Sequence, residues 1–256
     1  MNTPSALIDE VLLSSGLGSF LRSDSRRRLR HSYSGGMEFK QWIRNTVGAH
    51  RVRRVKAIRT QVACKFDFGP WRRPGLDGID VRLAEAFGWI RGGTFIELGG
   101  NDGLQFSNTL LLERELGWTG VLVEGIPELA AEALRNRPNA TVVCAAADGA
   151  SKFGIVAMND EDLISTISSS RGRICVATTT LSTVIDSVLA GQAPDLLIID
   201  VEGFEFDVLD GLDLSRHKPR WILVETAKAD DVSTVLSGYS LVLKMSYHDY
   251  LYRLNE

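Results

Sequence analysis

The sequence has 256 residues, of which 44% are apolar, 8% aromatic and 24% charged, and its formal net charge is −3. A chain of this size and composition can bury a hydrophobic core, which excludes an intrinsically disordered chain, a collagen-like repeat and a small disulfide scaffold. No apolar run approaches the roughly 20 residues that a membrane-spanning helix needs. Asp9 and Glu10 lie where a signal peptide would carry basic residues, so a cytoplasmic location is expected. The three scattered cysteines, Cys64, Cys144 and Cys175, suit such a reducing compartment and are predicted to be reduced and mostly buried.

The charges are distributed unevenly along the chain. Residues 1–75 contain 15 Lys and Arg against 5 Asp and Glu, whereas residues 76–256 contain 14 against 27. This difference predicts a basic, mainly helical segment over residues 1–79, with helical stretches at Ala6 to Leu13 and Phe39 to Val47, and a separate domain over residues 80–256. The basic segment is interpreted as a lid, a dimer arm or a substrate-binding surface.

The basic segment also bears on partners. Clustered arginines attract phosphate-rich partners, so peripheral contact with an anionic membrane or with a phosphorylated substrate is one hypothesis. The simpler alternative is that these arginines form a solvated surface or pair with the acidic residues in the rest of the chain. The sequence leaves open whether the protein forms a homo-oligomer. Nucleic acid is not expected, because no stacking aromatic residues are interleaved with the arginines.

From Asp80 onward, short apolar runs alternate with helical stretches. Runs that are apolar on both faces are typical of parallel strands covered by helices on both sides. The sequence therefore predicts an α/β fold with a doubly wound, mostly parallel sheet, whose ligands bind outside the carboxyl ends of the strands. The predicted strands are Gly93 to Leu98, Gly120 to Val123, Thr141 to Ala145, Leu196 to Ile199, Trp221 to Val224 and Ser240 to Met245; the predicted helices are Val81 to Trp89, Phe106 to Leu116, Pro127 to Asn136, Leu181 to Leu189 and Phe206 to Leu209; a polar loop is expected over Ser165 to Ser170.

The first central strand leads into a glycine-rich segment, Ile96 to Gly103. Glycines let a backbone turn tightly and approach a ligand, but the dinucleotide fingerprint Gly-x-Gly-x-x-Gly is matched poorly. Glu97, two residues before the first glycine, would repel a diphosphate and attract the ammonium of an amino-acid-bearing cofactor. The pattern acidic-x-Gly-x-x-x-Gly, met by Glu97, Gly99 and Gly103 with Asn101 between the glycines, indicates the S-adenosylmethionine loop of Rossmann-like methyltransferases.

Two further acids follow the next strands. Glu124 ends the second strand, where it can accept hydrogen bonds from both ribose hydroxyls. Asp148 follows the third strand, where it can accept from the exocyclic amine of adenine. Each acid alone is equally explained as a surface or turn residue. Three acids at the ends of three consecutive strands favour a ligand site.

Several short motifs then point to one family. The most specific is Asp200-Val201-Glu202-Gly203-x-Glu205; the others are Ile96 to Gly103, Ser107-Asn108-Thr109 with Leu112-Glu113, Gly117-Trp118-x-Gly120 and Leu122 to Gly125. Over roughly Thr94 to Arg253 the sequence resembles the FkbM-type methyltransferases, although Glu97 stands where Asp is commoner. The resemblance implies a Rossmann-like class I methyltransferase with a seven-stranded sheet. It also implies methylation of oxygen, with S-adenosylmethionine as cofactor, on sugars, glycolipids or polyketide natural products.

Three acidic residues are candidates for the acceptor side. Asp200 and Glu202 follow the fourth predicted strand and Glu225 follows the fifth, so they are expected to converge beside the transferred methyl group. One interpretation is a Mg²⁺ site that lowers the pKa of the substrate hydroxyl. The other is a metal-free general base whose pKa is raised by its acidic neighbours. Asp200 is also explained as a helix cap.

His248 is the histidine best placed to act in catalysis, because the last strands of such folds often border the acceptor pocket. It is predicted either as a base beside Asp249 or as a surface residue.

These observations predict an S-adenosylmethionine-dependent O-methyltransferase that acts on a small-molecule or glycan hydroxyl. Two alternatives remain. One is a non-catalytic binding protein that keeps this fold and uses its basic segment. The other is an NAD-dependent oxidoreductase, which would need Gly-x-Gly-x-x-Gly and a Tyr-x-x-x-Lys pair; the sequence has neither.

Overall fold

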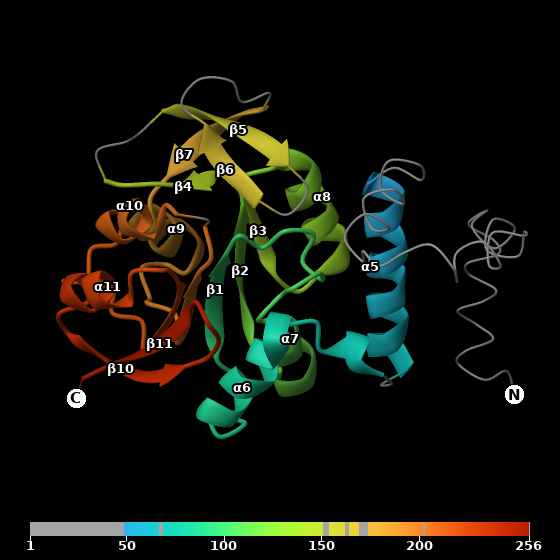
Figure 1. The fold of residues 1–256 in the computed structure, drawn as a ribbon, viewed down its shortest axis with the longest axis horizontal. Helices are drawn as coiled ribbons and strands as arrows, with labels where there is room; N and C mark the ends of the chain where they lie inside the picture. The colour runs from blue at the N-terminus through green and yellow to red at the C-terminus, as the bar shows by residue number, and fades with distance from the viewer. Residues whose placement is uncertain are drawn as a thin grey trace, which may run out of the picture. The chain divides into compact units, whose positions relative to one another are not determined.

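The computed structural model describes residues 49–66, 69–150, 154–161, 164–168, 174–201 and 203–255. The chain divides between Phe68 and Gly69 into two compact units. In the first unit the described part is one helix, α5 (Ala49–Phe66), which carries several of the predicted basic residues (Figure 1). The predicted helical stretches at 6–13 and 39–47 lie outside the described residues. The proposed boundary at residues 79 and 80 stays a prediction.

The second unit is built on a seven-stranded sheet with the order β10-β11-β9-β8-β1-β2-β3. The pairs β1–β2, β2–β3, β1–β8 and β8–β9 are parallel, and β11 runs antiparallel to both of its neighbours. The predicted doubly wound, mostly parallel sheet of a Rossmann-like methyltransferase is therefore confirmed. The strands are β1 (Thr94–Leu98), β2 (Thr119–Glu124), β3 (Thr141–Cys144), β8 (Leu196–Ile199), β9 (Trp221–Glu225), β10 (Tyr239–Lys244) and β11 (Asp249–Leu254).

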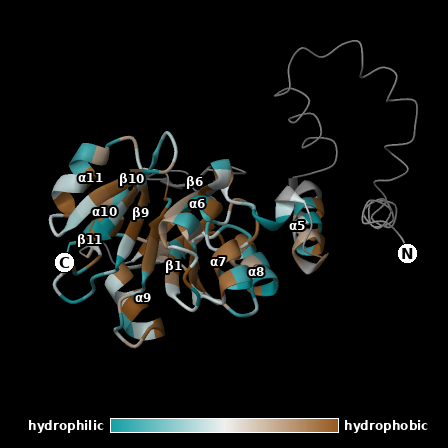
Figure 2. Ribbon diagram, turned by 90° about the horizontal axis from the view of Figure 1, so that it is seen from below, coloured by the Kyte–Doolittle hydropathy of each residue, from teal (hydrophilic) through white to brown (hydrophobic). Residues whose placement is uncertain are grey.

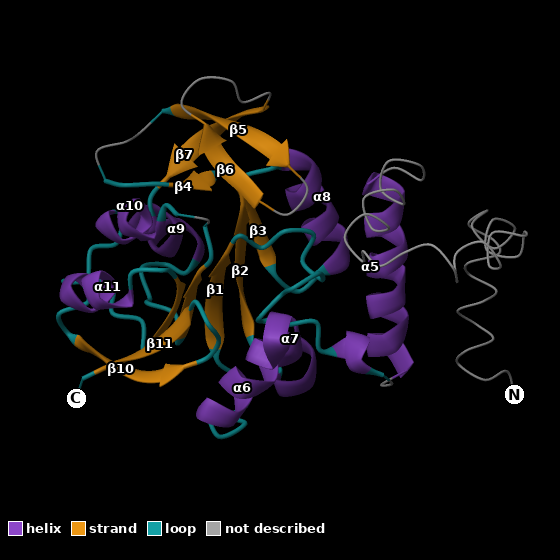
Figure 3. Cartoon of the chain, in the orientation of Figure 1, coloured by secondary structure: helices purple, strands orange, loops and turns teal. Residues whose placement is uncertain are grey.

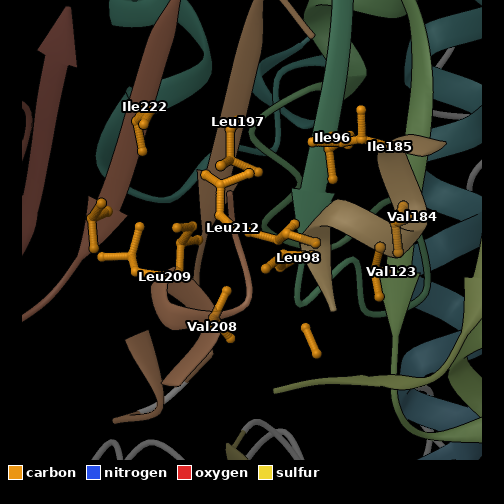
Figure 4. Close-up of a cluster of buried hydrophobic side chains, with 14 of the residues drawn as sticks. Ile96, Leu98, Val123, Val184, Ile185, Leu197, Val208, Leu209, Leu212 and Ile222 are labelled. Atoms are coloured by element: carbon orange, nitrogen blue, oxygen red, sulfur yellow. The ribbon is translucent and has the colours of Figure 1, made fainter. Parts of the chain in front are cut away.

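Helices cover both faces of this sheet because its central strands are apolar on both sides. In β1, Ile96 and Leu98 pack into one buried cluster while Phe95 packs into another. The first cluster includes residues of α9 (Leu181–Val188), α10 (Glu205–Asp210) and α11 (Ala229–Val235), and part of it is shown in Figure 4. The second includes residues of α6 (Ile79–Ala86), α7 (Leu110–Leu116) and α8 (Pro127–Asn136). In Figure 2 strand β9 is mainly brown, whereas α8 carries both colours.

A second, four-stranded sheet was not predicted. Its order is β4 (Ala146–Ala147), β7 (Ile174–Thr179), β5 (Ile155–Glu161), β6 (Ile164–Ser168), and it continues from the carboxyl end of β3 (Figure 3). The predicted polar loop at Ser165 to Ser170 is wrong over residues 165–168, because these residues pair antiparallel with β5. Backbone pairing with a neighbouring strand therefore outweighs the polar composition of this segment.

The start of one predicted helix also differs by several residues from the structure. The helix expected from Phe106 begins at Leu110, because Phe106 has a positive φ of 61° and cannot continue a right-handed helix. Neither the seventh strand, β11, nor helix α11 has a counterpart among the predicted strands and helices. Within the described ranges, no helix combines the length and the apolar character that crossing a bilayer requires.

Candidate functional site

A cavity of about 480 Å³ lies where the central parallel strands end. Its size is within the usual range for small-molecule and cofactor sites. Residues that follow β1, β2, β3 and β8 contribute to it, as do the last residue of β9 and the first of β11. The lining residues are Leu76, Ile79, Glu97, Gly99, Asn101, Gln105, Phe106, Asn108, Val123, Glu124, Gly125, Leu129, Ala145, Ala146, Ala147, Met158, Asp200, Val201, Phe204, Glu225 and Asp249.

The glycine turn after β1 brings two strand ends together. Gly99 has a φ of 74°, and a Cβ atom there would lie 2.2 Å from the Asp200 carbonyl oxygen. Only glycine therefore allows the turn after β1 to pass this close to the end of β8. The amides of Gly99 and Gly100 both donate to the Val123 carbonyl, at 3.0 and 3.2 Å. Gly103, also predicted as a cofactor residue, lies outside the cavity lining, where it packs against the side chain of Arg137.

Glu97 lines the cavity but is itself tightly held by the loop before α7. One carboxylate oxygen accepts from the Asn108 amide at 2.7 Å, and the other accepts from the hydroxyls of Ser107 at 3.0 Å and Thr109 at 2.5 Å. The side chain is only 3% exposed. Burial raises the pKa of Glu97, while the charge of Arg137 and the three hydrogen bonds oppose that rise. Glu97 therefore fixes the loop at residues 107–109 as well as facing the cavity.

Arg137 is the second anchor of this loop, and sequence reasoning missed it. Its guanidinium is fully buried and pairs with Glu113 at 2.6 Å. It also donates to the Gly103 carbonyl and to the hydroxyls of Ser107 and Thr109, each at 3.0 Å. Nothing in the sequence marks this arginine among the others of the chain, because its partners lie 24 to 34 residues away.

Glu124 is presented by β2 in the predicted position. It is 5% exposed; one carboxylate oxygen accepts from the Asn101 amide at 2.8 Å and the other from the Ile126 amide at 2.7 Å. Two backbone donors therefore hold the carboxylate in one orientation. Asn101, with a φ of 48°, also lines the cavity beside it.

Asp148 lies outside the cavity lining, although the residues before it belong to it. It is 5% exposed and accepts from the Gly149 amide at 2.8 Å. At this strand end the cavity wall is formed instead by Ala145, Ala146 and Ala147. The adenine contact of Asp148 stays a prediction.

The acceptor-side acids meet in the cavity only in part. Asp200 and Glu225 both line it, whereas Glu202 lies outside the described residues. The sequence predicts Asp249 only as a possible neighbour of a catalytic His248, yet Asp249 lines the cavity and lies opposite Glu225 in the antiparallel pair β9–β11. Burial raises the pKa of Asp249, and the charge of Glu225 adds to this rise. Its position opposite Glu225 becomes visible only once β11 pairs with β9 in the folded chain.

His248 has an exposed side chain that contacts the Tyr247 ring, and it does not line the cavity. Its effect on the site is indirect, because its charge works against the raised pKa of Asp249. A catalytic role for His248 stays a prediction.

No group of three or more His, Cys, Asp or Glu residues within the described ranges is arranged to hold a metal ion. Asp200 and Glu225 are two of the three predicted ligands, and the third, Glu202, falls outside those ranges. The Mg²⁺ site of Asp200, Glu202 and Glu225 therefore gains no support from the structure and stays a prediction.

The electrostatic character of the cavity is uniform. Five carboxylates line it, and none of its described lining residues is Lys, Arg or His. Such a wall attracts cations and disfavours diphosphates. The five are Glu97, Glu124, Asp200, Glu225 and Asp249.

Comparison with known proteins adds a family match. A sequence-family model described as Methyltransferase FkbM domain matches residues 97–252. No curated protein sequence matches the chain. Among solved structures, the chain is similar to the methyltransferase FkbM from Methylobacillus flagellatus KT, with 14% identity, a TM-score of 0.43, and coverage of 80% of this chain and 60% of that one. It is also similar to a TehB-like SAM-dependent methyltransferase from Corynebacterium glutamicum, with 12% identity, a TM-score of 0.41, and coverage of 78% and 96%.

Proposed function

The chain belongs to the methyltransferase FkbM domain family, and from this membership we propose that it transfers a methyl group from S-adenosylmethionine to a hydroxyl of a sugar, glycolipid or natural product. The observation that carries the proposal is the carboxylate-lined cavity at the carboxyl ends of the strands. Its charge suits a cofactor that bears a sulfonium and an ammonium. The same charge argues against NAD, whose diphosphate these carboxylates would repel.

The cofactor side of the cavity is formed by the ends of β1 and β2. Two backbone amides orient the Glu124 carboxylate, and a carboxylate is the acceptor that suits the two ribose hydroxyls. Glu97 supplies negative charge near the amino-acid end. Gly99 and Asn101 form the wall between these two acids. Asp148, which follows Ala145 to Ala147 in the chain, is proposed to accept from the exocyclic amine of adenine.

The acceptor side must hold a hydroxyl in line with the methyl group and take its proton. When bound, S-adenosylmethionine supplies an electrophilic methyl group on a positively charged sulfur. Holding the acceptor oxygen close to the methyl group and in line with it removes most of the remaining activation barrier. Asp200 and Asp249 line this part of the cavity, and a carboxylate here can accept the hydroxyl proton as the oxygen attacks. If Mg²⁺ takes part, Asp200, Glu202 and Glu225 would hold it and polarise the same hydroxyl.

Calorimetry tests the cofactor assignment. Wild type should bind S-adenosylmethionine and not NAD, and Glu124→Ala should weaken binding by about 10- to 100-fold, as expected for the loss of charged hydrogen bonds. The exposed Glu128 provides a matched control, and Glu128→Ala should leave the affinity unchanged. Binding of NAD in place of S-adenosylmethionine would overturn the proposal, and repeating the titration with EDTA shows whether a metal contributes.

The reaction is tested with methyl-labelled S-adenosylmethionine and a panel of sugars, glycolipids and polyketides. Label transferred to a hydroxyl forms an ether and should survive mild alkali. Asp200→Asn should bind the cofactor normally and lose turnover. Alkali-labile label would indicate an ester and would contradict a hydroxyl acceptor. Binding without transfer to any of the panel would favour the binding-protein alternative.

A further inference from the structure

The loop that precedes α7 contains a buried polar atom with no hydrogen-bond partner. Asn108 is 6% exposed and lines the cavity, yet among the described residues its amide oxygen, Oδ1, has no donor. Buried acceptors almost always have a donor, so an exception at a cavity wall calls for a partner that comes from outside the protein.

The position of Asn108 is fixed from both sides. Its backbone amide donates to Glu97 at 2.7 Å, and its neighbours Ser107 and Thr109 donate to the same carboxylate. Arg137 holds both of those hydroxyls at 3.0 Å. The Asn108 side chain is therefore held against the cavity by contacts that do not use its own amide group.

The same hydrogen bonds leave the Glu97 carboxylate little capacity to accept hydrogen bonds from a ligand. An ionised carboxylate offers about four acceptor positions, and the loop fills three of those on Glu97. Glu97 thus contributes charge and loop position, and most of its hydrogen-bonding capacity is already used. An incoming ammonium, which carries three N–H donors, needs further acceptors at this wall.

We propose that the side-chain amide oxygen of Asn108 accepts a hydrogen bond from the ammonium of the ligand's α-amino acid end, with Glu97 as the residue that positions it. This inference rests on the proposed function, since it assigns a contact of the same cofactor. A neutral acceptor supported by a buried carboxylate satisfies the ammonium donors and leaves the loop contacts of Glu97 intact.

Three ligands that share an adenosyl thioether separate this contact from its alternatives. S-adenosylhomocysteine carries both ammonium and carboxylate, aminopropylthioadenosine carries the ammonium alone, and methylthioadenosine carries neither. We expect Asn108→Ala to weaken binding of the first two by about 10- to 100-fold, the loss typical of a hydrogen bond to a charged group. Binding of methylthioadenosine should be unchanged. The exposed Asn139 provides the matched control, and Asn139→Ala should bind all three ligands like wild type.

The other outcomes overturn the inference in distinguishable ways. Loss of S-adenosylhomocysteine binding alone would place Asn108 on the carboxylate. Equal weakening of all three ligands would show a purely structural role, and no weakening would show no contact. Wild type that binds none of the three would overturn the proposed function as well.

A second variant keeps the test valid if Asn108→Ala is poorly folded. Asn108→Asp preserves the shape of the side chain and an acceptor oxygen. It should bind both ammonium-bearing ligands within about threefold of wild type or more tightly, because the added charge favours a cation. Strong loss of aminopropylthioadenosine binding in this variant would contradict an ammonium contact.

Discussion

The two sides of the cavity hold their acids in different ways. On the cofactor side, Glu97 and Glu124 are almost fully buried, and backbone amides or loop hydroxyls fix both carboxylates. On the acceptor side, Asp200, Glu225 and Asp249 are partly exposed. Under the proposed function, this difference means that the cofactor side is preorganised for one ligand, whereas the acceptor side could take a proton and fit different acceptors.

The largest expected effect comes from breaking the anchor of the cofactor side. Arg137→Ala would leave Glu113 buried without its ion-pair partner and release the hydroxyls that hold Glu97. Breaking a buried pair in this way typically costs about 3–5 kcal/mol. Urea unfolding of wild type and variant measures the loss in the free energy of unfolding.

An exposed ion pair supplies the control for this prediction. Arg216 pairs with Asp186 at 2.8 Å, with side chains that are 54% and 41% exposed. Arg216→Ala should lower the free energy of unfolding far less than Arg137→Ala does, because solvent screens exposed pairs. Similar losses in the two variants would show that the loop does not depend on its buried arginine.

The next largest effect is expected at the close contact between Gly99 and Asp200, where the cofactor side of the cavity meets the acceptor side. Gly99→Ala places a methyl group 2.2 Å from the Asp200 carbonyl oxygen, so β1 and β8 must separate at the point where the cavity begins. Gly117 has a similar φ of 70° with nothing within 4 Å of a new Cβ, so Gly117→Ala carries only the conformational cost of about 1–2 kcal/mol. Gly99→Ala should lose about 1–3 kcal/mol more, the usual cost of overpacking. It should also weaken S-adenosylmethionine binding, which calorimetry measures.

Equal stability of the Gly99 and Gly117 variants would show that the strand ends move apart at no cost. The turn would then not define the distance between cofactor and acceptor.

The same comparison explains how much of the molecule the sequence could predict. The central strands were predicted almost residue by residue, because residues such as Ile96 and Phe95 are apolar on opposite faces and fit only a covered parallel sheet. Glu97 and Glu124 followed from the same reasoning, since an acid that directly follows such a strand lies at the sheet edge. Both residues line the cavity, as expected of ligand contacts.

The remaining features depend on contacts between residues far apart in the sequence. Arg137 is defined by partners on other elements, and the unpaired oxygen of Asn108 is visible only once the loop is folded. The second sheet escaped prediction because its strand β6 is polar and is stabilised by pairing with β5. The predicted cysteine burial also fails, since Cys144 and Cys175 are exposed on strands β3 and β7.

The smallest expected effect tests whether the acceptor side holds a carboxyl that readily binds a proton. Burial raises the pKa of Asp249, the charges of Glu225 and Asp77 add to this rise, and the Ser246 hydrogen bond and His248 oppose it. Because the pKa is higher in the folded than in the unfolded protein, the folded state binds the proton more tightly. The contribution of this group to stability is therefore greatest below the unfolded pKa of about 3.9 and falls as the pH rises through the folded pKa.

Asp249→Asn should consequently be more stable than wild type at neutral pH, by less than about 1 kcal/mol, because the amide carries no charge to be buried or repelled. The advantage should shrink as the pH falls through the folded pKa towards the unfolded value of about 3.9, below which the carboxyl is protonated in both states. Asp213→Asn is a control of opposite sign: hydrogen bonds from Ser215 lower the pKa of Asp213, so its removal should destabilise the protein at neutral pH and matter less in acid. Urea unfolding between pH 4 and pH 8 measures both differences. If the Asp249 variant has the same pH dependence as wild type, then the acceptor side does not raise the proton affinity of this carboxyl, and the general base must be sought at Asp200 or Glu225.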